Sequence, residues 1–205
     1  MDKLVKKRRG GPRTFDRDQA IDIAMRLFWR HGYEGVSLND LTAAIGIAPP
    51  SLYAAFGSKA GLYREALDRY SGLPRALSNL GETANLYEAV ETLLDRAIDA
   101  VTDPDEERGC MISSGMIQCG EAHAALAREL AERRSMMRDT IALKLEPWLD
   151  RNHAASLSRY LVTILQGLSV QARDGASRED LKQIASEVVA GVKARNLPDY
   201  KRGAP

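Results

Sequence analysis

The chain has 205 residues, a hydrophobic fraction of 44%, a charged fraction of 28% and a formal net charge of +1. These values are typical of soluble globular proteins and argue against a largely disordered or membrane-embedded chain. No apolar run approaches the roughly 20 residues that span a bilayer, and the basic N-terminus leads into no apolar signal segment, so we expect a cytoplasmic protein with no membrane partner.

The charge is unevenly distributed along the chain. Residues 1–60 hold ten Lys and Arg against six Asp and Glu, a net charge of +4, which leaves −3 for the remainder. A basic N-terminal third is a modest indication of a surface for a polyanion. Residues 1–13 combine a basic cluster with Gly10, Gly11 and Pro12, so we expect them to form a flexible arm.

The first helix signal follows this arm. Asp16 with Gln19 is a capping-box pattern, and Gly32 is a typical helix terminator. Between them, apolar residues recur at helical spacing at Ala20, Ala24, Leu27 and Phe28. The pattern predicts an amphipathic helix.

The next two helices are short and are joined by a tight turn. A second capping pattern begins at Ser37, and Gly46 ends the helix predicted over residues 38–45. Pro50 suits a first helical turn, where its missing N–H has no intrahelical partner, and Gly57 ends this third helix. Two helices of about two turns with such a turn meet the physical requirement of a helix-turn-helix, which places its second helix in the DNA major groove.

Residue types in and after the third helix suit DNA contact. The small side chains of Ala48, Ala54 and Ala55 allow a close approach, while Ser51, Tyr53 and Lys59 supply hydroxyl and ammonium groups that bind phosphates.

The remaining chain is also predicted to be helical. Ser58 caps a helix over residues 59–70, residues 72–85 form a joint, and residues 198–205 form a frayed tail. Further helices are expected over residues 86–101, 110–119, 123–149, 154–172 and 178–192. No run of β-branched residues with a period of two lies between turn signals, so the predicted fold class is all-α.

At this point the sequence resembles a known family. The segments HGYEGVSL, DLTAAIGIAPPSLYAAF and SKAGL, within residues 14–67, are similar to the N-terminal domain of the TetR/AcrR family of bacterial repressors. The resemblance implies an arm over residues 1–13, a helix-turn-helix DNA-binding domain over 14–58, a helical ligand-binding and dimerisation domain over 59–197 and a tail over 198–205. Beyond residue 67 the match is in helical character alone.

The resemblance also implies roles for single positions. Ser37 and Asn39 would contact the DNA backbone and a base edge, Tyr53 and Lys59 would bind phosphates, and Arg13 and Thr14 would anchor the arm. Pro49, Pro50, Ser51 and Tyr53 would form the face of the recognition helix. Ala54 and Ala55 stand where many relatives carry larger side chains, so few groups remain to read bases.

The last two predicted helices carry wide apolar stripes that need partners. The stripes could be buried within one chain, but the resemblance favours pairing with their copies across a two-fold axis, in a homodimer whose recognition helices reach successive major grooves. The predicted interface residues are Leu157, Leu161, Ile164, Leu165, Leu168, Leu181, Ile184, Val188 and Val192.

Between the two ends of the chain lies a set of adaptable apolar side chains. Methionine often lines promiscuous binding surfaces, so these residues are either plain core or the lining of a cavity for a small apolar or aromatic effector. They are Tyr87, Cys110, Met111, Met116, Cys119, Met136, Met137 and Trp148.

The two cysteines leave an alternative open. Cys110 and Cys119 are nine residues apart and would lie on opposite faces of a helix, which disfavours a disulfide within the chain. They are interpreted as small hydrophobic side chains or as a thiol or metal sensor, although neither has a His or Cys at ligand spacing.

The function predicted from these features is that of a DNA-binding repressor, whose partners are operator DNA, a second copy of itself and a small-molecule effector. The alternative is a thiol- or metal-responsive regulator on the same fold. An enzyme is disfavoured because His31, His123 and His153 are scattered and fit no catalytic motif. No catalytic residue, metal or cofactor is therefore expected.

Overall fold

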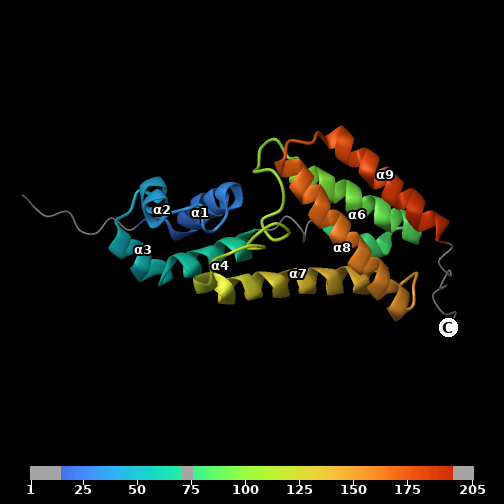
Figure 1. Cartoon of the computed structure of the whole chain (residues 1–205), viewed down its shortest axis with the longest axis horizontal. Helices are drawn as coiled ribbons and strands as arrows, with labels where there is room; N and C mark the ends of the chain where they lie inside the picture. Colours follow the sequence, from blue (N-terminus) through green and yellow to red (C-terminus); the bar gives the residue numbers. More distant parts are fainter. Residues whose placement is uncertain (1–14, 71–75, 196–205) are drawn as a thin grey trace, which may run out of the picture.

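The computed structural model describes residues 15–70 and 76–195. This part of the chain contains eight α-helices, two 3-10 turns and no strand, which confirms the predicted all-α class. Figure 1 shows an elongated molecule with α1 to α3 at one end and α6, α8 and α9 at the other, while α4 and α7 run along one side. The predicted arm and tail, together with Arg13 and Thr14, lie outside the described residues.

The first three helices begin and end where local signals place them. They are α1 (Arg17–His31), α2 (Leu38–Ile45) and α3 (Pro49–Phe56). Asp16 accepts hydrogen bonds from the backbone N–H groups of Asp18 and Gln19, and Ser37 forms a reciprocal capping box with Asp40. Gly46 ends α2 in the left-handed conformation, with φ 76° and ψ 31°, which glycine adopts without a steric penalty. The capping residues are thus confirmed.

Helix α4 (Lys59–Arg69) packs along α1 and completes the core of this end. Ser58 caps it by accepting a hydrogen bond from the N–H of Gly61. The ring of Tyr63 meets Phe28 edge to face at a centroid distance of 4.9 Å and lies 5.1 Å from the ring of Tyr33. Since all three rings are buried, α4 belongs to the same core as α1.

The other end is built from four longer helices. They are α6 (Leu86–Val101), α7 (Ala124–Leu145), α8 (Arg151–Arg173) and α9 (Arg178–Ala194). A 3-10 turn, η1 (Leu80–Glu82), precedes α6, and a second, η2 (Glu121–His123), precedes α7. Helix α8 packs against α7, and α9 packs against α6. None of the helices in the described part of the chain combines the length and apolar character that crossing a bilayer requires.

The helix predicted over residues 110–119 is wrong. Residues 102–120, which we name the connector, form turns and bends between α6 and η2. Glycines at 109, 115 and 120 interrupt this stretch, and Gly109 and Met116 have positive φ values of 82° and 51°. Cys110, Met111 and Ile112 are buried in succession, which is not the one-sided burial of an amphipathic helix.

Candidate DNA-binding interface and effector cavity

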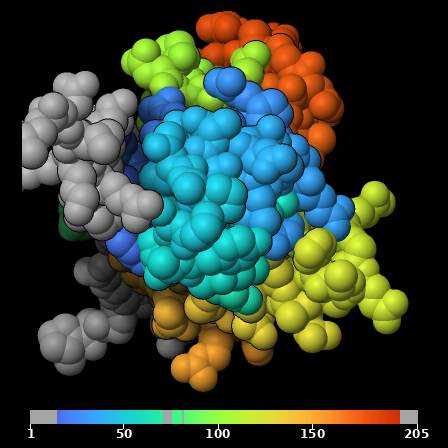
Figure 2. All heavy atoms as spheres, turned by 90° about the vertical axis from the view of Figure 1, so that its left-hand side faces the viewer, coloured from blue at the N-terminus to red at the C-terminus, as the bar shows by residue number. Residues whose placement is uncertain are grey.

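The recognition face is an exposed side of α3. Leu52 and Phe56 point into the core and anchor the helix, while Pro49, Pro50 and Ser51 are exposed. Tyr53 is 47% exposed, so it is not a core aromatic. Figure 2 shows the atoms of α2 and α3 side by side at this end of the molecule. The arrangement presents hydroxyl groups and small apolar side chains on one short, firmly anchored helix.

The prolines also change what the start of α3 offers. Both lie in its first turn, and the N-cap residue, Ala48, makes no side-chain cap. Because proline carries no N–H, two of the donors that usually point out of a helix N-terminus are missing. Contacts at this point therefore depend on the pyrrolidine rings and on the hydroxyl of Ser51.

The start of α2 lies beside this face and is polar. Ser37 and Asn39 are both exposed. The carboxylate of Asp40 accepts a hydrogen bond of 2.8 Å from the N–H of Ser37, and hydrogen bonding to Ser37 lowers the pKa of Asp40 below its ordinary value. The Ser37 hydroxyl oxygen in turn accepts a hydrogen bond of 3.1 Å from the N–H of Asp40.

Lys59 lies at the start of α4 and is half-buried. Its Nζ atom lies 4.3 Å from the centroid of the Tyr33 ring, a cation–π contact that holds the ammonium group in place. Burial lowers the pKa of Lys59, and nearby Glu34 and Asp40 partly oppose this shift. A pre-positioned ammonium at a helix N-terminus is a suitable phosphate ligand.

The stripes predicted to form the dimer interface lie mainly in the core of the single chain. Seven of the nine residues are buried there: Leu157, Leu161, Leu165, Leu168, Leu181, Val188 and Val192. Ile164 is half-buried, and Ile184 is 39% exposed. The prediction is corrected for these seven residues. Helices α6 and α7 cover the apolar stripes of α8 and α9 within the chain, so the stripes do not face outward.

A different surface of α8 and α9 remains apolar and open. Val170 is 42% exposed on α8, and Ile184 is exposed on α9. Gly167 on α8 and Gly191 on α9 have no atom within 4 Å of the position that a Cβ would occupy. A second helix could therefore approach both helices closely.

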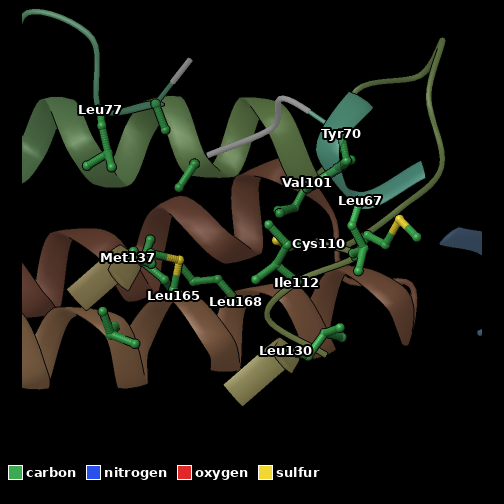
Figure 3. Close-up of a cluster of buried hydrophobic side chains, with 14 of the residues drawn as sticks. Leu67, Tyr70, Leu77, Val101, Cys110, Ile112, Leu130, Met137, Leu165 and Leu168 are labelled. Carbon is green, nitrogen blue, oxygen red and sulfur yellow. The ribbon is translucent and has the colours of Figure 1, made fainter. Parts of the chain in front are cut away.

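The main cavity, which we name the α4–α7 groove, has a volume of 550 Å³. This size falls within the usual range for small-molecule sites. Its lining comes from the end of α4, residues 77 and 78, the connector and α7: Leu67, Asp68, Tyr70, Leu77, Ser78, Ile112, Arg133, Met136, Met137, Thr140 and Lys144. Figure 3 shows five apolar residues of this lining within a larger buried cluster, namely Leu67, Tyr70, Leu77, Ile112 and Met137.

Three of the eight residues predicted for an effector site line a cavity. Met136 and Met137 line the α4–α7 groove, and Cys110 lines a neighbouring cavity of 20 Å³. Met111 and Met116 are buried in the core, and Cys119, Tyr87 and Trp148 are half-buried. The sequence pattern did not indicate Tyr70, which lines both cavities.

Tyr70 leads from the cavities to the DNA-binding end. This residue ends α4, is buried, and its ring meets Trp29 of α1 edge to face at a centroid distance of 4.8 Å. Burial raises the pKa of the Tyr70 hydroxyl well above its ordinary value, so the group is protonated at neutral pH. Tyr70 therefore lies between the two cavities and Trp29 of α1.

The connector meets the same tryptophan. The Nε1–H of Trp29 donates a buried hydrogen bond of 2.9 Å to the carbonyl of Gly109, and Arg173 of α8 donates one of 2.6 Å to the carbonyl of Trp29. A buried indole N–H needs a partner, but the sequence did not show that Trp29 is buried. Its partners could not be read from sequence.

Further polar contacts fasten the connector to α1 and α7. Glu106 and Glu107 pair with Arg26 and Arg30 of α1, at 3.2 and 2.6 Å. From α7, Arg134 donates hydrogen bonds of 3.1 and 2.9 Å to the carbonyls of Ile112 and Gly115. Because Ile112 also lines the α4–α7 groove, the connector touches both the groove and the DNA-binding end.

The histidines and cysteines form no common site. His31 lies on α1, His123 in η2 and His153 on α8. Both cysteines are free, and no group of three or more potential metal ligands is found among the described residues.

Comparison with known proteins agrees with this geometry. Residues 20–66 match the family described as bacterial regulatory proteins, tetR family. The chain is 37% identical over 193 residues to the HTH-type transcriptional repressor ComR of Escherichia coli, covering 88% of this chain and 90% of ComR. It is 33% identical to the repressor BdcR of the same species, covering 90% of this chain and 92% of BdcR.

A solved structure shows the same fold at similar identity. A cysteine mutant of the TetR family transcriptional regulator CifR, complexed with 26-base-pair operator DNA, is 34% identical with a TM-score of 0.81. The match covers 88% of this chain and 98% of that one. A TetR family regulator from Cytophaga hutchinsonii, at 17% identity, has a TM-score of 0.71 and covers 91% of this chain and 96% of its own, which extends the likeness of fold.

Proposed function

The chain belongs to the TetR family of bacterial regulatory proteins and is a DNA-binding transcriptional repressor rather than an enzyme, and on this premise we propose that a small molecule in the α4–α7 groove releases it from its operator. Two copies would present their α3 helices about 34 Å apart to successive major grooves of a near-palindromic site. Binding to chromosomal DNA would place the protein in the cytoplasm.

The exposed face of α3 is the observation that carries the DNA-binding proposal. We assign Pro49, Pro50 and Ser51 to the DNA major groove and Tyr53 to a phosphate. The rings of the two prolines offer apolar contact suited to thymine methyl groups. The pre-positioned Lys59 would bind a second phosphate. Ser37 and Asn39 would contact the DNA backbone from α2, and Arg13 and Thr14 would extend the contact beyond the described residues.

The test is operator binding by variants that leave the core untouched. Fluorescence anisotropy with duplexes from the upstream region of the protein's own gene should show salt-dependent binding. Lys59→Gln should weaken binding about equally for all duplexes and make the salt dependence shallower by about one unit, because one phosphate contact is lost. Lys182→Gln, on α9, is the matched control. If none of the upstream duplexes bound the protein in a salt-dependent way, the assignment would be refuted.

We further propose that the dimer forms through the outward faces of α8 and α9, centred on Ile164, Gly167, Val170, Ile184 and Gly191. Exposed apolar side chains beside two open glycines allow four helices to approach closely across a two-fold axis. Val170→Glu and Ile184→Glu should each shift the sedimentation profile toward monomer. Val189→Ala, a change inside the chain's own core, should leave the dimer intact.

The proposed coupling passes through Trp29. A ligand in the groove would touch Tyr70 and Ile112, and these two residues reach Trp29 through a ring contact and through the connector carbonyl of Gly109. A ligand shifts the protein between two dimer geometries only to the extent that it binds them differently. A movement of α1 relative to the connector would change the shape of the groove and so give the two geometries different affinities for the ligand.

Trp29→Phe tests this route. The variant keeps an aromatic ring against Tyr70 but loses the hydrogen bond to Gly109, so operator affinity should change little while release by an active compound weakens. Trp148→Phe is the control, because Trp148 lines neither cavity. Equal release from both variants and the parent protein would contradict the route.

A thiol-based response is the second candidate. Cys110 lines the small cavity beside Tyr70, and its Sγ accepts a hydrogen bond from the N–H of Ser113 at 3.4 Å. Modification of this thiol would disturb the same junction. Replacing Cys110 and Cys119 with Ser and comparing operator release by oxidant, copper or zinc separates the candidates, because unchanged release supports the small-molecule proposal.

A further inference from the structure

We propose that the α4–α7 groove selects an anionic amphiphile, a molecule with an apolar body and one negatively charged group. This inference names the ligand class for the effector cavity and so rests on the proposed function. It follows from how apolar and charged residues are arranged around the groove.

The floor of the groove is apolar and pre-formed. Five side chains line this floor, and each of them is otherwise buried in the core: Leu67, Tyr70, Leu77, Ile112 and Met137. Figure 3 shows these residues coming from α4, residue 77, the connector and α7 toward one cluster. Binding an apolar body here removes more hydrocarbon surface from water without rearranging the core.

Met136 extends this surface to the rim. Its side chain is 59% exposed although it lines the groove, and methionine adapts its shape to different apolar partners. An exposed, flexible apolar side chain beside a buried apolar floor is suited to close over a ligand body.

The charges on the rim are unequal. Asp68 and Arg133 pair with each other across the groove from α4 and α7. Lys144, further along α7, has no ion-pair partner among the described residues. The pair neutralises itself, so Lys144 leaves the rim with a net positive charge.

A second guanidinium lies behind the connector wall. Arg134 donates to the carbonyls of Ile112 and Gly115, and no carboxylate in the described part of the chain forms an ion pair with it. Because Ile112 lines the groove, this guanidinium lies next to the groove wall and adds positive charge beside it. The lining also includes the hydroxyl-bearing Ser78 and Thr140. An anionic group is thus favoured over a cationic one.

The length of the groove fits a body with its charge at one end. Arg133 and Lys144 are eleven residues apart on α7, which is about 16 Å along the helix axis. A ligand whose anionic group reaches Lys144 therefore lays its apolar body over Met136 and Met137, which lie between these two positions.

The test compares two fluorescent probes with the same ring body. The anion 8-anilinonaphthalene-1-sulfonate carries a sulfonate, and N-phenyl-1-naphthylamine lacks it. Titration of the full-length protein without DNA should show tighter binding of the sulfonate. Lys144→Glu should weaken sulfonate binding about tenfold, because an attraction becomes a repulsion, and should change the affinity for the neutral probe less than about twofold.

Two further variants guard the interpretation. Thr140→Glu adds a negative charge to the exposed rim and should also weaken binding of the sulfonate alone, whereas Lys182→Glu on α9 should change neither probe. Circular dichroism checks that each variant is folded. Equal affinities for the two probes, no binding of either, or an equal effect of Lys182→Glu would each overturn the inference.

The outcome is separable from the repressor function. Probe binding is measured without DNA, and operator binding is measured without a probe. If the sulfonate binds at Lys144 but does not release the operator, the proposed effector role fails and the ligand class stands. If operator release follows a neutral compound with no dependence on Lys144, the ligand class fails and the effector role stands.

Discussion

The DNA-binding end and the connector are fixed by opposite kinds of interaction. Helices α1 and α2 begin at side-chain caps, α3 begins at two prolines, and all three end at a glycine, so these signals act within a few residues of each helix end. The connector has no regular structure, and its course is set by Trp29, Arg134 and Ser169, which are distant in sequence. The recognition helix thus lies on a locally specified surface, whereas the conformation of the connector depends on contacts that form only in the folded chain.

The largest effect should come from the aromatic core that joins both parts. Phe28 is buried against Tyr33 and Tyr63, and the buried cluster continues from it into the C-terminal helices. Phe28→Ala should cost about 3–5 kcal/mol of unfolding free energy, since it leaves a cavity. Urea unfolding followed by Trp fluorescence and by circular dichroism should give coincident midpoints, both lowered.

Leu161→Ala, in the core of the other end, is the comparison. Its expected loss is about 2–5 kcal/mol, again with coincident midpoints. Separate transitions in either variant would show that the two ends unfold independently and would break the idea of one continuous core.

A smaller effect is expected at Gly115 in the connector. A Cβ there would lie 2.4 Å from the carbonyl oxygen of Met111 and 2.8 Å from Cδ2 of Leu130, so Gly115→Ala forces the connector to move. The expected loss is about 1–3 kcal/mol, as for other overpacked sites. Ser114→Ala, the neighbouring change without this clash, should cost less in the same urea titration, and the reverse order would contradict the tight fit.

Gly46 tests the locally specified end by the same substitution. A Cβ at this position meets no atom within 4 Å, but the residue has a φ of 76°. Gly46→Ala should therefore cost about 1–2 kcal/mol through backbone strain alone. Gly46→Asn should recover part of this loss, because Asn tolerates the left-handed conformation. If Gly46→Asn lost as much unfolding free energy as Gly46→Ala, the turn would depend on more than its φ value.

The same contrast explains what sequence could predict. The bounds of the helix-turn-helix could be predicted because they are set by local signals, namely Ser37, Gly46, Gly57 and Ser58. The exposure of Tyr53 on α3 could be predicted because Leu52 and Phe56 occupy its apolar face. The stripes that contain Leu161 on α8 and Val188 on α9 also showed their helical period, but periodicity does not tell which partner covers a stripe, and α6 and α7 cover both within the chain.

The groove could not be predicted for a related reason. Its floor joins Leu67, Leu77, Ile112 and Met137, which are separated in sequence and meet only through tertiary structure. Of the four methionines predicted to line an effector cavity, Met136 and Met137 line this groove, whereas the residues across the groove carry no local signal. The three glycines of the connector favour turns, but the helix was predicted from its apolar residues alone.

The smallest predicted effect compares two capping boxes, one at each end of the molecule. Asp40 caps α2 with Ser37, and Asp180 caps α9 with Ser177. Hydrogen bonds from the serine hydroxyl and backbone lower the pKa of both carboxyls. Because the folded-state pKa is depressed, this stabilisation is present above the unfolded value of about 3.9 and is lost as the pH falls through the folded pKa. Asp40→Asn and Asp180→Asn should each make stability less dependent on pH below about 4.

Salt should separate the two boxes. The charges of His31 and Lys59 also lower the pKa of Asp40, whereas the shift of Asp180 comes from hydrogen bonds to Ser177. Screening weakens interactions between exposed charges far more than it weakens hydrogen bonds between neighbouring groups. Carboxyl titration by NMR in about 1 M salt should therefore raise the pKa of Asp40 more than that of Asp180. Equal shifts would mean that the DNA-binding end lacks the extra positive field that distinguishes its cap.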